Sequence, residues 1–326
     1  MSAPLLSIRD LTVDFVTRQG IVHALDGVSF DVGAGEIVGI IGESGSGKTV
    51  TAHAVIGILE HSARIRRGEV LFDGQDVLSL SPRAREKWRR RAASIIFQNP
   101  RAALNPIRPV GAQIADVIAR HRPGSSAEIR GQVLAAMRQT RIPDPERRMS
   151  ALPFELSGGL CQRIGIAMAL ASAPRLLIAD EPTTGLDVTT QAVIMELIRQ
   201  LARERGMSVA LITHDIALAA KFCDRLVIMH AGHVVETGPV ETVARRPRHP
   251  YTAGLLRSVP SLVDRIEELQ PVKGSLPDLL RTDLPFCRFA ERCDRRIPVC
   301  DAGALKLRPS DARGYAPHQI ACRNPL

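Results

Sequence analysis

The chain has 326 residues, a net charge of +9 and 45% hydrophobic residues. This length permits one large domain or two modest ones. A bilayer-spanning helix needs about 20 mostly apolar residues, and every apolar run is shorter, so we expect no membrane span. The first ten residues lack the basic and then apolar pattern of a secretory signal, so we expect a cytosolic chain. The positive charge suits nucleic acid or an anionic membrane, but equally an arginine-rich surface, so it selects no partner.

The N-terminal third predicts strands followed by a glycine-rich turn. Residues 5–40 alternate apolar and polar positions, as in Leu11–Phe15 and Val28–Val32, which indicates short and largely antiparallel strands. The apolar segment Gly35–Ile41 predicts a strand that runs into a glycine-rich turn and then a helix from about Lys48. Another strand is predicted at Glu69–Phe72, before a turn.

The middle of the chain differs in composition from the N-terminal third. Between residues 81 and 149 arginine, alanine and glutamine dominate, and the amphipathic segments Gly111–Arg120 and Ala127–Arg141 predict an inserted helical subdomain. Strand patterns then alternate with helices, which predicts a parallel sheet covered on both faces. These later strands are expected at Leu176–Ala179, Val209–Ile212 and Leu226–Met229. After Pro247 the alternation stops, and a tail rich in proline and cysteine follows.

One segment fits the phosphate-loop pattern G-x-x-x-x-G-K-[ST] between a predicted strand and helix. Glycines let backbone N–H groups close around phosphate oxygens, and the helix N-terminus adds partial positive charge. We therefore predict an ATP site in which Lys48 reaches the β- and γ-phosphates and the Thr49 hydroxyl ligates Mg²⁺. The residues of the segment are Gly42, Glu43, Ser44, Gly45, Ser46, Gly47, Lys48 and Thr49.

Two acids, Asp180 and Glu181, end the predicted strand at Leu176–Ala179. The carboxyl ends of parallel strands form the edge at which nucleotides bind. We predict that Asp180 helps to hold Mg²⁺ and that Glu181 polarises the attacking water, because phosphoryl transfer depends on positioning and charge stabilisation. Standing alone, two acids after a strand are more often a helix cap. The phosphate loop earlier in the chain favours the catalytic interpretation.

A second predicted anion site begins at Leu156, where Ser157, Gly158 and Gly159 open a helix that continues through Gln162. A chain with one nucleotide does not need two such sites. We predict that this segment closes on the γ-phosphate held by another subunit in a head-to-tail pair. A plain helix cap by Ser157 is the alternative.

With these three motifs in this order, residues 5–245 resemble the nucleotide-binding subunits of ABC transporters. The resemblance extends to Gln98 as the Q-loop, Asp187 as the D-loop and His214 as the switch histidine. It implies that Gln98 contacts Mg²⁺ or water and senses a transmembrane partner, and that His214 contacts the γ-phosphate. It also implies an α/β P-loop NTPase fold of the ABC type, with a RecA-like core, an antiparallel β subdomain and a helical subdomain.

Two positions fit this family less closely. The family stacks adenine on an aromatic residue upstream of the phosphate loop, and Phe15 is the candidate here, although it could equally be a strand core residue. Before Gln162 the family commonly has a longer polar or basic side chain where this sequence has Cys161. That cysteine is either a silent surface variation or the mark of a less active composite site.

The tail resembles the C-terminal extension of oligopeptide and dipeptide importer ATPases, which also occurs in nickel and glutathione importers. The resemblance rests on Arg246–Tyr251 and Val272–Pro277. In that group four cysteines can hold an iron–sulfur cluster, and four thiolates are the number such a cluster takes. The spacing lacks the close pairs of structural zinc sites, so we expect [4Fe–4S] first, with zinc or unliganded thiols as alternatives. The cysteines are Cys287, Cys293, Cys300 and Cys322.

We expect this cluster to be structural, since a proline-rich tail buries little apolar area. Without it, residues after about 280 should loosen. The phosphate loop is far away in the sequence, so we expect basal ATP binding to survive loss of the cluster.

These inferences predict a nucleotide-binding domain at residues 1–246, with its helical subdomain at about 81–165, and an extension at 247–326. The expected function is ATP hydrolysis that energises uptake of di- or oligopeptides or a related solute. The expected partners are a second ATPase subunit, with a heterodimer favoured, two permease subunits and an extracytoplasmic solute-binding protein. The expected location is the cytoplasmic face of the cell membrane, peripherally bound.

The alternative function is a soluble ABC ATPase that acts on nucleic acid or the ribosome. The sequence has neither a long heptad segment nor a second nucleotide domain, so we expect no direct nucleic-acid partner. A non-hydrolysing regulatory subunit is disfavoured because Glu181, His214 and Ser157 are all present. The sequence leaves open which solute is transported, whether the pair is a homodimer, whether both composite sites are active, and the cluster type.

Overall fold

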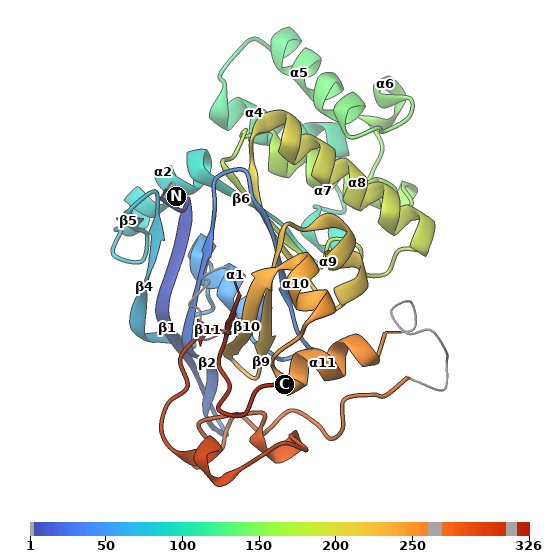
Figure 1. The fold of residues 1–326 in the computed structure, drawn as a ribbon. Helices are drawn as coiled ribbons and strands as arrows, with labels where there is room; N and C mark the ends of the chain where they lie inside the picture. Colours follow the sequence, from blue (N-terminus) through green and yellow to red (C-terminus); the bar gives the residue numbers. More distant parts are fainter. Residues whose placement is uncertain (1–2, 260–268, 311–317) are drawn as a thin grey trace. The chain divides into compact units, whose positions relative to one another are not determined.

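The structure is a computed structural model that describes residues 3–259, 269–310 and 318–326 (Figure 1). The chain divides into two compact units. Unit 1 comprises Met1–Ser79 and Leu211–Leu326, and unit 2 comprises Leu80–Ala210. Within the described ranges, no helix is long and apolar enough to cross a membrane.

Unit 1 contains a four-stranded antiparallel sheet, drawn in blue in Figure 1. Its strands are hydrogen-bonded in the order β2 (Gly20–Val32), β1 (Leu6–Thr17), β4 (Ala63–Phe72) and β5 (Gln75–Asp76). Two of them, β1 and β2, are 12 and 13 residues long, so they are not the short strands that the sequence predicts. Irregular register near Leu11 lets the long β1 bend without ending.

The other strands of unit 1 belong to a mixed sheet, which has both parallel and antiparallel pairs. The hydrogen-bonded order is β11 (Arg308–Pro309), β12 (Gln319–Ile320), β10 (His233–Pro239), β9 (Arg225–His230) and β3 (Ile37–Ile41). Strand β3 runs parallel to β9 and is buried at all five residues. The helices of unit 1 are α1 (Lys48–Ile56), α9 (Ile216–Phe222), α10 (Val240–Arg245) and α11 (Pro250–Arg257).

The C-terminal extension is built into unit 1. Strand β12 pairs with β10, and α11 and the 3₁₀ turns Ala290–Arg292 and Pro298–Asp301 belong to the same stretch of chain. Glu236 of β10 is fully buried and accepts backbone hydrogen bonds from Arg248 (2.7 Å) and His249 (3.0 Å), and its Oε1 lies 2.7 Å from His318 Nε2. The premise that little besides a cluster could order this tail is therefore wrong, because unit 1 also holds it.

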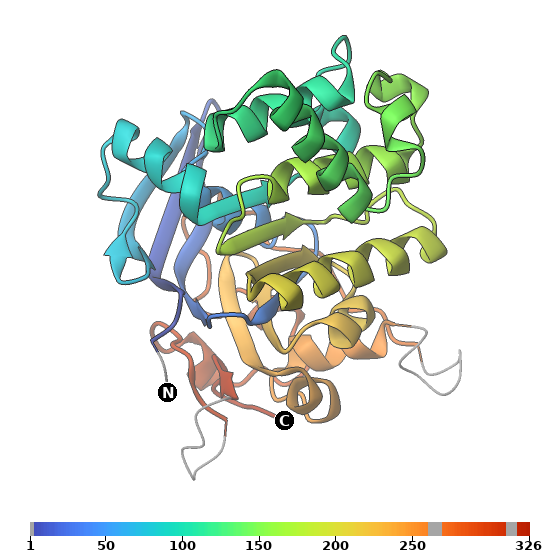
Figure 2. The ribbon, with the colours of Figure 1, turned by 90° about the horizontal axis from the view of Figure 1, so that it is seen from above.

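Unit 2 contains two parallel strands, β6 (Ala93–Ile96) and β7 (Leu176–Asp180), and the division between the units falls inside β8 (Ser208–Thr213). Its helices include the helical segments that the sequence predicts, and they are drawn in cyan to yellow (Figure 2). They are α2 (Pro82–Ala92), α3 (Pro100–Ala103), α4 (Val110–His121), α5 (Ser126–Gln139), α6 (Pro145–Arg148), α7 (Gly158–Leu170) and α8 (Val188–Arg205), with a 3₁₀ turn at Pro153–Glu155.

Helices α4, α5 and α7 share one apolar core. Val110, Ile114 and Ile118 recur at every fourth position of α4, and all three are buried with Met137 of α5 and Ile164 of α7. This spacing places the apolar side chains on one helix face. The two predicted amphipathic helices therefore lie within two residues of α4 and α5 at each end.

The predicted domain boundaries at residues 81, 165 and 246 stay predictions. Unit 2 contains the strands β6 and β7 and helix α8 in addition to the helical insertion, so it does not coincide with the predicted subdomain.

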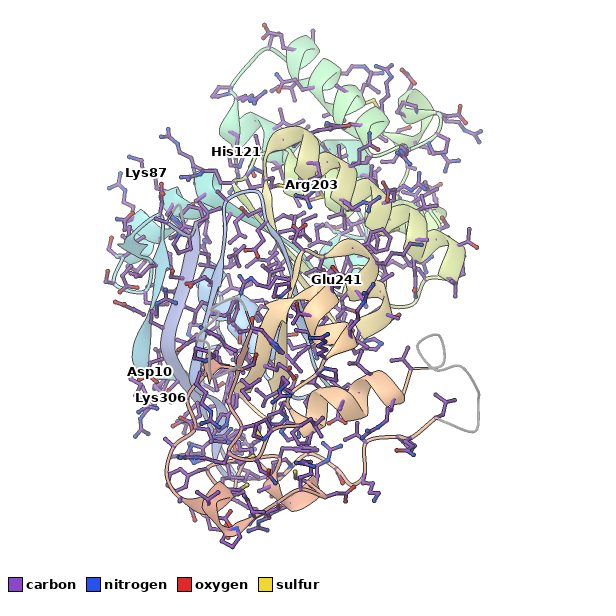
Figure 3. The ribbon with its side chains drawn as sticks, viewed as in Figure 1. Asp10, Lys87, His121, Arg203, Glu241 and Lys306 are labelled. Atoms are coloured by element: carbon purple, nitrogen blue, oxygen red, sulfur yellow. The ribbon has the colours of Figure 1, made fainter. Side chains whose placement is uncertain are left out.

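The charged residues lie mainly at the surface, as Figure 3 illustrates with Asp10, Lys87, Arg203, Glu241 and Lys306, all of which are exposed. Helix α2 alone carries five arginines and one lysine, and only its last residue, Ala92, is buried. The positive net charge is therefore in part a solvated, arginine-rich surface.

Candidate functional site

The predicted phosphate-binding loop, residues 42–47, connects β3 to α1 in unit 1, and its shape requires glycine at two points. A Cβ atom on Gly42 would lie 2.2 Å from the Met229 carbonyl oxygen, and one on Gly47 would lie 2.6 Å from Leu25 Cδ2. Gly47 also has a φ of 99°, in the left-handed region that favours glycine. The backbone can therefore curve tightly enough to surround an anion at the start of a helix.

The side chains of the loop suit a triphosphate. Lys48 is 5% exposed, and its ammonium group donates hydrogen bonds to the carbonyl oxygens of Gly42 (2.8 Å) and Glu43 (2.9 Å). The Ser46 hydroxyl is buried, and no partner for it occurs among the described residues. Buried polar groups nearly always have partners, and a phosphate oxygen would supply one. Ser44, Gly45 and Thr49 are exposed.

In unit 2, the predicted acid pair lies at the end of β7. Every residue of that strand is buried, including Asp180 at 2% exposure. Glu181 follows directly and has a φ of 43°. A residue other than glycine rarely adopts this conformation, and such strain is concentrated at functional sites, where the surroundings hold it.

Gln98 meets Glu181 in unit 2. The parallel register pairs Ile96, the last residue of β6, with Ala179 of β7, so the residues that follow both strands lie at the same sheet edge. Gln98 Nε2 donates to Glu181 Oε2 at 3.0 Å, and Thr184 Oγ1 donates to the same oxygen at 2.9 Å. The Glu181 carboxylate is thus oriented by two neutral donors, a role for Thr184 that the sequence did not suggest.

The predicted signature segment forms the start of α7. Ser157 is the N-cap residue, and its hydroxyl accepts from the Leu160 N–H at 3.4 Å. Gly158 and Gly159 lie in the first turn, where a Cβ on Gly159 would be 3.0 Å from Thr190 Cγ2. A helix N-terminus with small residues leaves room for an anion. The geometry is equally that of an ordinary capped helix.

Two neighbours of this segment differ from the sequence-based expectation. Gln162 is 1% exposed and its Nε2 lacks a partner in the described parts of the chain, so it does not reach the surface to contact a partner's ATP. Cys161 is fully buried in the α4–α5–α7 core, where burial raises its pKa, and is not a surface variation. The Cys161 side chain points inward because the apolar core covers its side of α7.

Asp187 caps helix α8. Its Oδ1 accepts from the Thr190 N–H at 3.0 Å and its Oδ2 from the Thr190 hydroxyl at 2.6 Å, and these hydrogen bonds lower the pKa of the carboxyl group. This contact stabilises the start of the helix. Helix capping alone therefore accounts for an aspartate at this position, with no contact to a partner subunit needed.

His214 and Phe15 both lie in unit 1. His214 directly follows β8 and is exposed, as a residue that meets a nucleotide must be. Phe15 is half-buried in β1, where it pairs with Val22 of β2. Ile65, which is exposed, pairs with Val13 two residues before Phe15, so it lies on the same face of the sheet as Phe15. The adenine-stacking role of Phe15 stays a prediction.

Residues of the C-terminal extension contact the phosphate-binding loop directly. The Tyr251 hydroxyl accepts a hydrogen bond from the Glu43 N–H at 3.1 Å, and Arg292 makes a double ion pair with the Glu43 carboxylate. The loop and the tail are therefore in direct contact although they lie far apart in the sequence, and the survival of ATP binding without the cluster stays a prediction. The sequence shows the Tyr251 motif, but nothing local to it indicates a partner more than 200 residues away.

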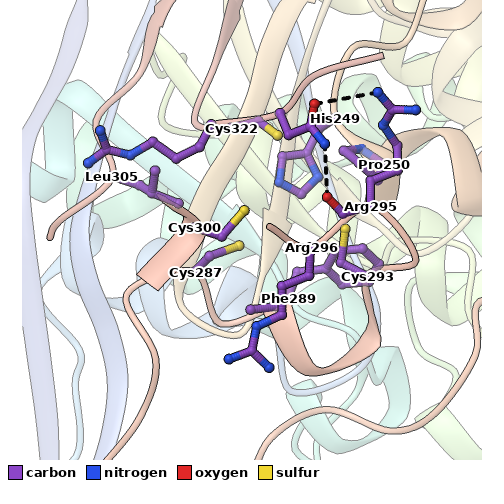
Figure 4. A pocket seen from close by; sticks show the side chains of 13 residues that line it. His249, Pro250, Cys287, Phe289, Cys293, Arg295, Arg296, Cys300, Leu305 and Cys322 are labelled. Atoms are coloured by element: carbon purple, nitrogen blue, oxygen red, sulfur yellow. Dashed lines mark hydrogen bonds between the residues drawn. The ribbon is translucent and has the colours of Figure 1, made fainter. Parts of the chain in front are cut away.

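The four tail cysteines line one cavity, together with His249 and Phe289 (Figure 4). Burial raises the pKa of Cys287 to about 11 and also raises those of Cys293 and Cys322. No three His, Cys, Asp or Glu side chains of the described residues are grouped closely enough to hold a metal ion. The described residues therefore form no ready-made site for a single metal ion, and neither the zinc nor the iron–sulfur prediction is confirmed.

Comparison with known proteins decides the family. The sequence model of the ABC transporter family matches residues 25–184, and that of the oligopeptide/dipeptide transporter C-terminal region matches residues 235–300. The dipeptide transport ATP-binding protein DppD of Bacillus subtilis is 45% identical over 318 residues, which are 97% of this chain and 93% of that protein. This chain belongs to the ATP-binding subunits of ABC transporters.

Other relatives agree with this assignment. The probable D,D-dipeptide transport ATP-binding protein of Escherichia coli is 43% identical over 303 residues, which are 92% of each chain. Among solved structures, the dimeric ATP-binding cassette MJ0796 bound to ADP and Pi has a TM-score of 0.65 at 29% identity, over 72% of this chain and 98% of that chain. The predicted ABC fold is confirmed, and so is the predicted ATPase activity.

The Gln98–Glu181 contact generates a prediction for this ATPase. Glu181→Gln should preserve MgATP binding but slow hydrolysis by about 10²–10³-fold, because an amide cannot accept the proton of the attacking water. Single-turnover hydrolysis and ATP affinity, measured on the same protein, separate the two effects. Glu196→Gln, which changes a half-buried glutamate on α8 of the same unit, is the matched control. Near-normal hydrolysis by Glu181→Gln would remove Glu181 from this role.

Proposed function

We propose that this ABC ATPase energises the import of di- or oligopeptides across the cytoplasmic membrane. The observation that carries the proposal is the oriented Gln98–Glu181 pair in a chain whose phosphate loop is shaped for a triphosphate. The peptide substrate is supported by relatives named as dipeptide transport proteins and by the matching oligopeptide/dipeptide C-terminal region.

The chemistry follows from the groups that each unit contributes. Hydrolysis forms a bond between a water oxygen and the γ-phosphorus and breaks the bond to the β,γ-bridging oxygen. Lys48 and the loop N–H groups would bind the phosphates. Glu181, held by Gln98, would orient the water and accept its proton. His214 would contact the γ-phosphate.

Mg²⁺ would neutralise charge on the phosphates. The chain offers oxygen ligands of the type that Mg²⁺ prefers, namely the Thr49 hydroxyl, the Asp180 carboxylate and the Gln98 amide. Thr49 is exposed, while Asp180 is buried at the end of β7 and is held in place by the strand.

The proposed active form pairs this chain with a second ATPase subunit. Each chain has one phosphate loop and one signature segment, so a head-to-tail pair completes two sites, and Ser157, Gly158 and Gly159 would contact the partner's γ-phosphate. The related cassette MJ0796 was solved as a dimer with ADP and Pi, which supports pairing. We favour a heterodimer with a sister ATPase, as the sequence resemblance implies.

We further propose that unit 2 docks on two permease subunits at the cytoplasmic face of the membrane, with an extracytoplasmic protein delivering the solute. Unit 2 exposes several large apolar side chains, which suit a protein interface. They are Phe97 at 42%, Ile107 at 82% and Phe154 at 70% exposure. The alternative, an ATPase acting on nucleic acid or the ribosome, is not favoured because the relatives with the same extension are named for peptide transport.

The pairing predicts an effect of Ser157→Arg on hydrolysis but not on binding. A bulky cation at the start of α7 should block the partner's site, while this chain's own loop keeps its ATP affinity. ATP hydrolysis should be measured against protein concentration, alone and with the permease and sister ATPase subunits. Ser125→Arg is the matched control, since Ser125 caps α5 in the same way. If both variants lose activity equally, Ser157 acts only as a helix cap.

For the four cysteines we propose a [4Fe–4S] cluster. Each thiolate of such a cluster binds a different iron, so its ligands are spread more widely than those of one zinc ion. Three observations support it: the four side chains line one cavity, that cavity is partly buried, and His249 Nε2, which also lines it, is buried with no partner among the described residues. His249 Nδ1 accepts from the Tyr251 N–H at 3.1 Å, so Nε2 would carry the proton and could donate to a sulfide.

The cluster proposal predicts brown anaerobic protein with close to four irons and four sulfides per chain. Cys293→Ser should bleach this colour, and Cys223→Ser, which changes a cysteine outside the cavity, should not. Because unit 1 also holds the extension, the bleached variant should remain folded. Metal analysis that finds zinc without sulfide would reassign the site. Four freely alkylated thiols in the native anaerobic protein would eliminate both metal proposals.

A further inference from the structure

We propose that Arg292 of the C-terminal extension is a positioning residue for ATP, which acts by fixing Glu43 in the phosphate-binding loop. The extension would then be part of the nucleotide site rather than an accessory to it. This inference rests on ATP binding at residues 42–49, and it goes beyond the proposed function by assigning a task to the extension.

The ion pair between Arg292 and Glu43 is a two-point contact. Nη1 donates to Oε2 at 2.7 Å, and Nη2 donates to Oε1 at 2.9 Å. The Arg292 side chain is 5% exposed and that of Glu43 is 29% exposed, so the pair is largely removed from solvent. A planar guanidinium that meets both carboxylate oxygens fixes direction as well as distance.

Arg292 is itself held from its other sides. Its Nε donates to the Lys273 carbonyl oxygen at 2.7 Å, and its Nη1 also lies 3.1 Å from His230 Nε2. Burial, followed by the nearby Arg292 charge, lowers the pKa of His230 to about 2, so this histidine is neutral and can accept the contact. The ring of Phe289 lies 5.7 Å from the guanidinium carbon. The guanidinium therefore has one orientation, and that orientation points at Glu43.

Glu43 in turn is fixed at three points within the loop. Its side chain meets Arg292, its N–H donates to the Tyr251 hydroxyl, and its carbonyl oxygen accepts from the Lys48 ammonium group at 2.9 Å. Two of these three contacts come from the extension. Because Glu43 contacts both residues, a displacement of Arg292 would also displace Lys48, the predicted phosphate ligand.

Charge gives Arg292 a second effect. A carboxylate in a phosphate-binding loop repels the anion that the loop must bind, and the repulsion is strong where water is scarce. Arg292 neutralises that carboxylate. Its removal should leave the Glu43 charge uncompensated beside the phosphates, whereas replacing Glu43 by glutamine should remove the need for Arg292.

Residues 276–279 of the extension also lie close to the loop and to β2. A Cβ on Gly45, at the tip of the loop, would lie 3.4 Å from Leu276 Cδ1. The Leu279 carbonyl oxygen accepts from the His23 N–H of β2 at 3.0 Å. Arg292 also directly precedes Cys293, which lines the cysteine cavity, so the cavity and the phosphate loop are connected by adjacent residues.

The test is MgATP affinity of the full-length chain, measured by isothermal titration calorimetry. Arg292→Met should weaken binding by about tenfold, which corresponds to roughly 1.4 kcal/mol. Glu43→Gln, which breaks the same ion pair, should weaken binding less than Arg292→Met because it leaves no uncompensated charge, and the double variant should bind nearly as well as Glu43→Gln. Arg281→Met is the matched control, because Arg281 pairs with Asp283 and Glu291 in the extension and not with the loop.

The double variant separates positioning from general support of the fold. Unchanged affinity in Arg292→Met, or a double variant as weak as Arg292→Met, would overturn the proposal. If Arg292→Met does not fold, Arg292→Lys takes its place. It keeps the charge but cannot meet both oxygens, so it should bind MgATP more weakly than wild type, and wild-type affinity would count against the proposal. Failure of the wild-type chain to bind MgATP would instead contradict the proposed function.

Discussion

Tyr251 is fully buried in a core that joins the phosphate-binding loop to the C-terminal extension. It packs in one cluster with Ile41, the last residue before the loop, and with Phe289 of the extension. Removal of a buried aromatic side chain typically costs about 3–5 kcal/mol, a large part of the 5–15 kcal/mol that stabilises a typical domain. Burial raises the pKa of Tyr251, so its hydroxyl stays protonated where it meets the Glu43 N–H. The loop that binds the phosphates therefore depends on packing contributed by the tail.

The contact between Gln98 and Glu181 in unit 2 depends on a different constraint, the register of two parallel strands. Because Ile96 pairs with Ala179, Gln98 and Glu181 follow their strands at the same edge and meet. The strained backbone of Glu181 persists because buried β7 precedes it and two donors hold its carboxylate.

Much of this could be predicted because the signals are local. The buried strand β3, the glycines of the loop, the amphipathic helices α4 and α5 and the acids after β7 are all patterns of fewer than twenty residues. The contacts that could not be predicted join distant residues. Glu43 and Arg292 are 249 positions apart, and no periodicity or spacing links them. The burial of Cys161 could not be predicted for a related reason, since α4 and α5 decide which face of α7 it lies on.

The anchoring of the tail changes the interpretation of its cysteines. Glu236, His318 and strand β12 attach the extension to unit 1 through hydrogen bonds that need no metal. A cluster in the cysteine cavity would therefore not be required for folding, and its task would lie in what it does to its neighbours. Those neighbours include Arg292, and through it the phosphate-binding loop.

Amide hydrogen exchange with and without MgATP tests most directly whether the extension and the nucleotide loop form one cooperative unit. The account predicts that MgATP slows exchange both in residues 42–49 and in residues 287–293, although the latter lie in the C-terminal tail. Slower exchange in the loop, with no change in the extension, would contradict it.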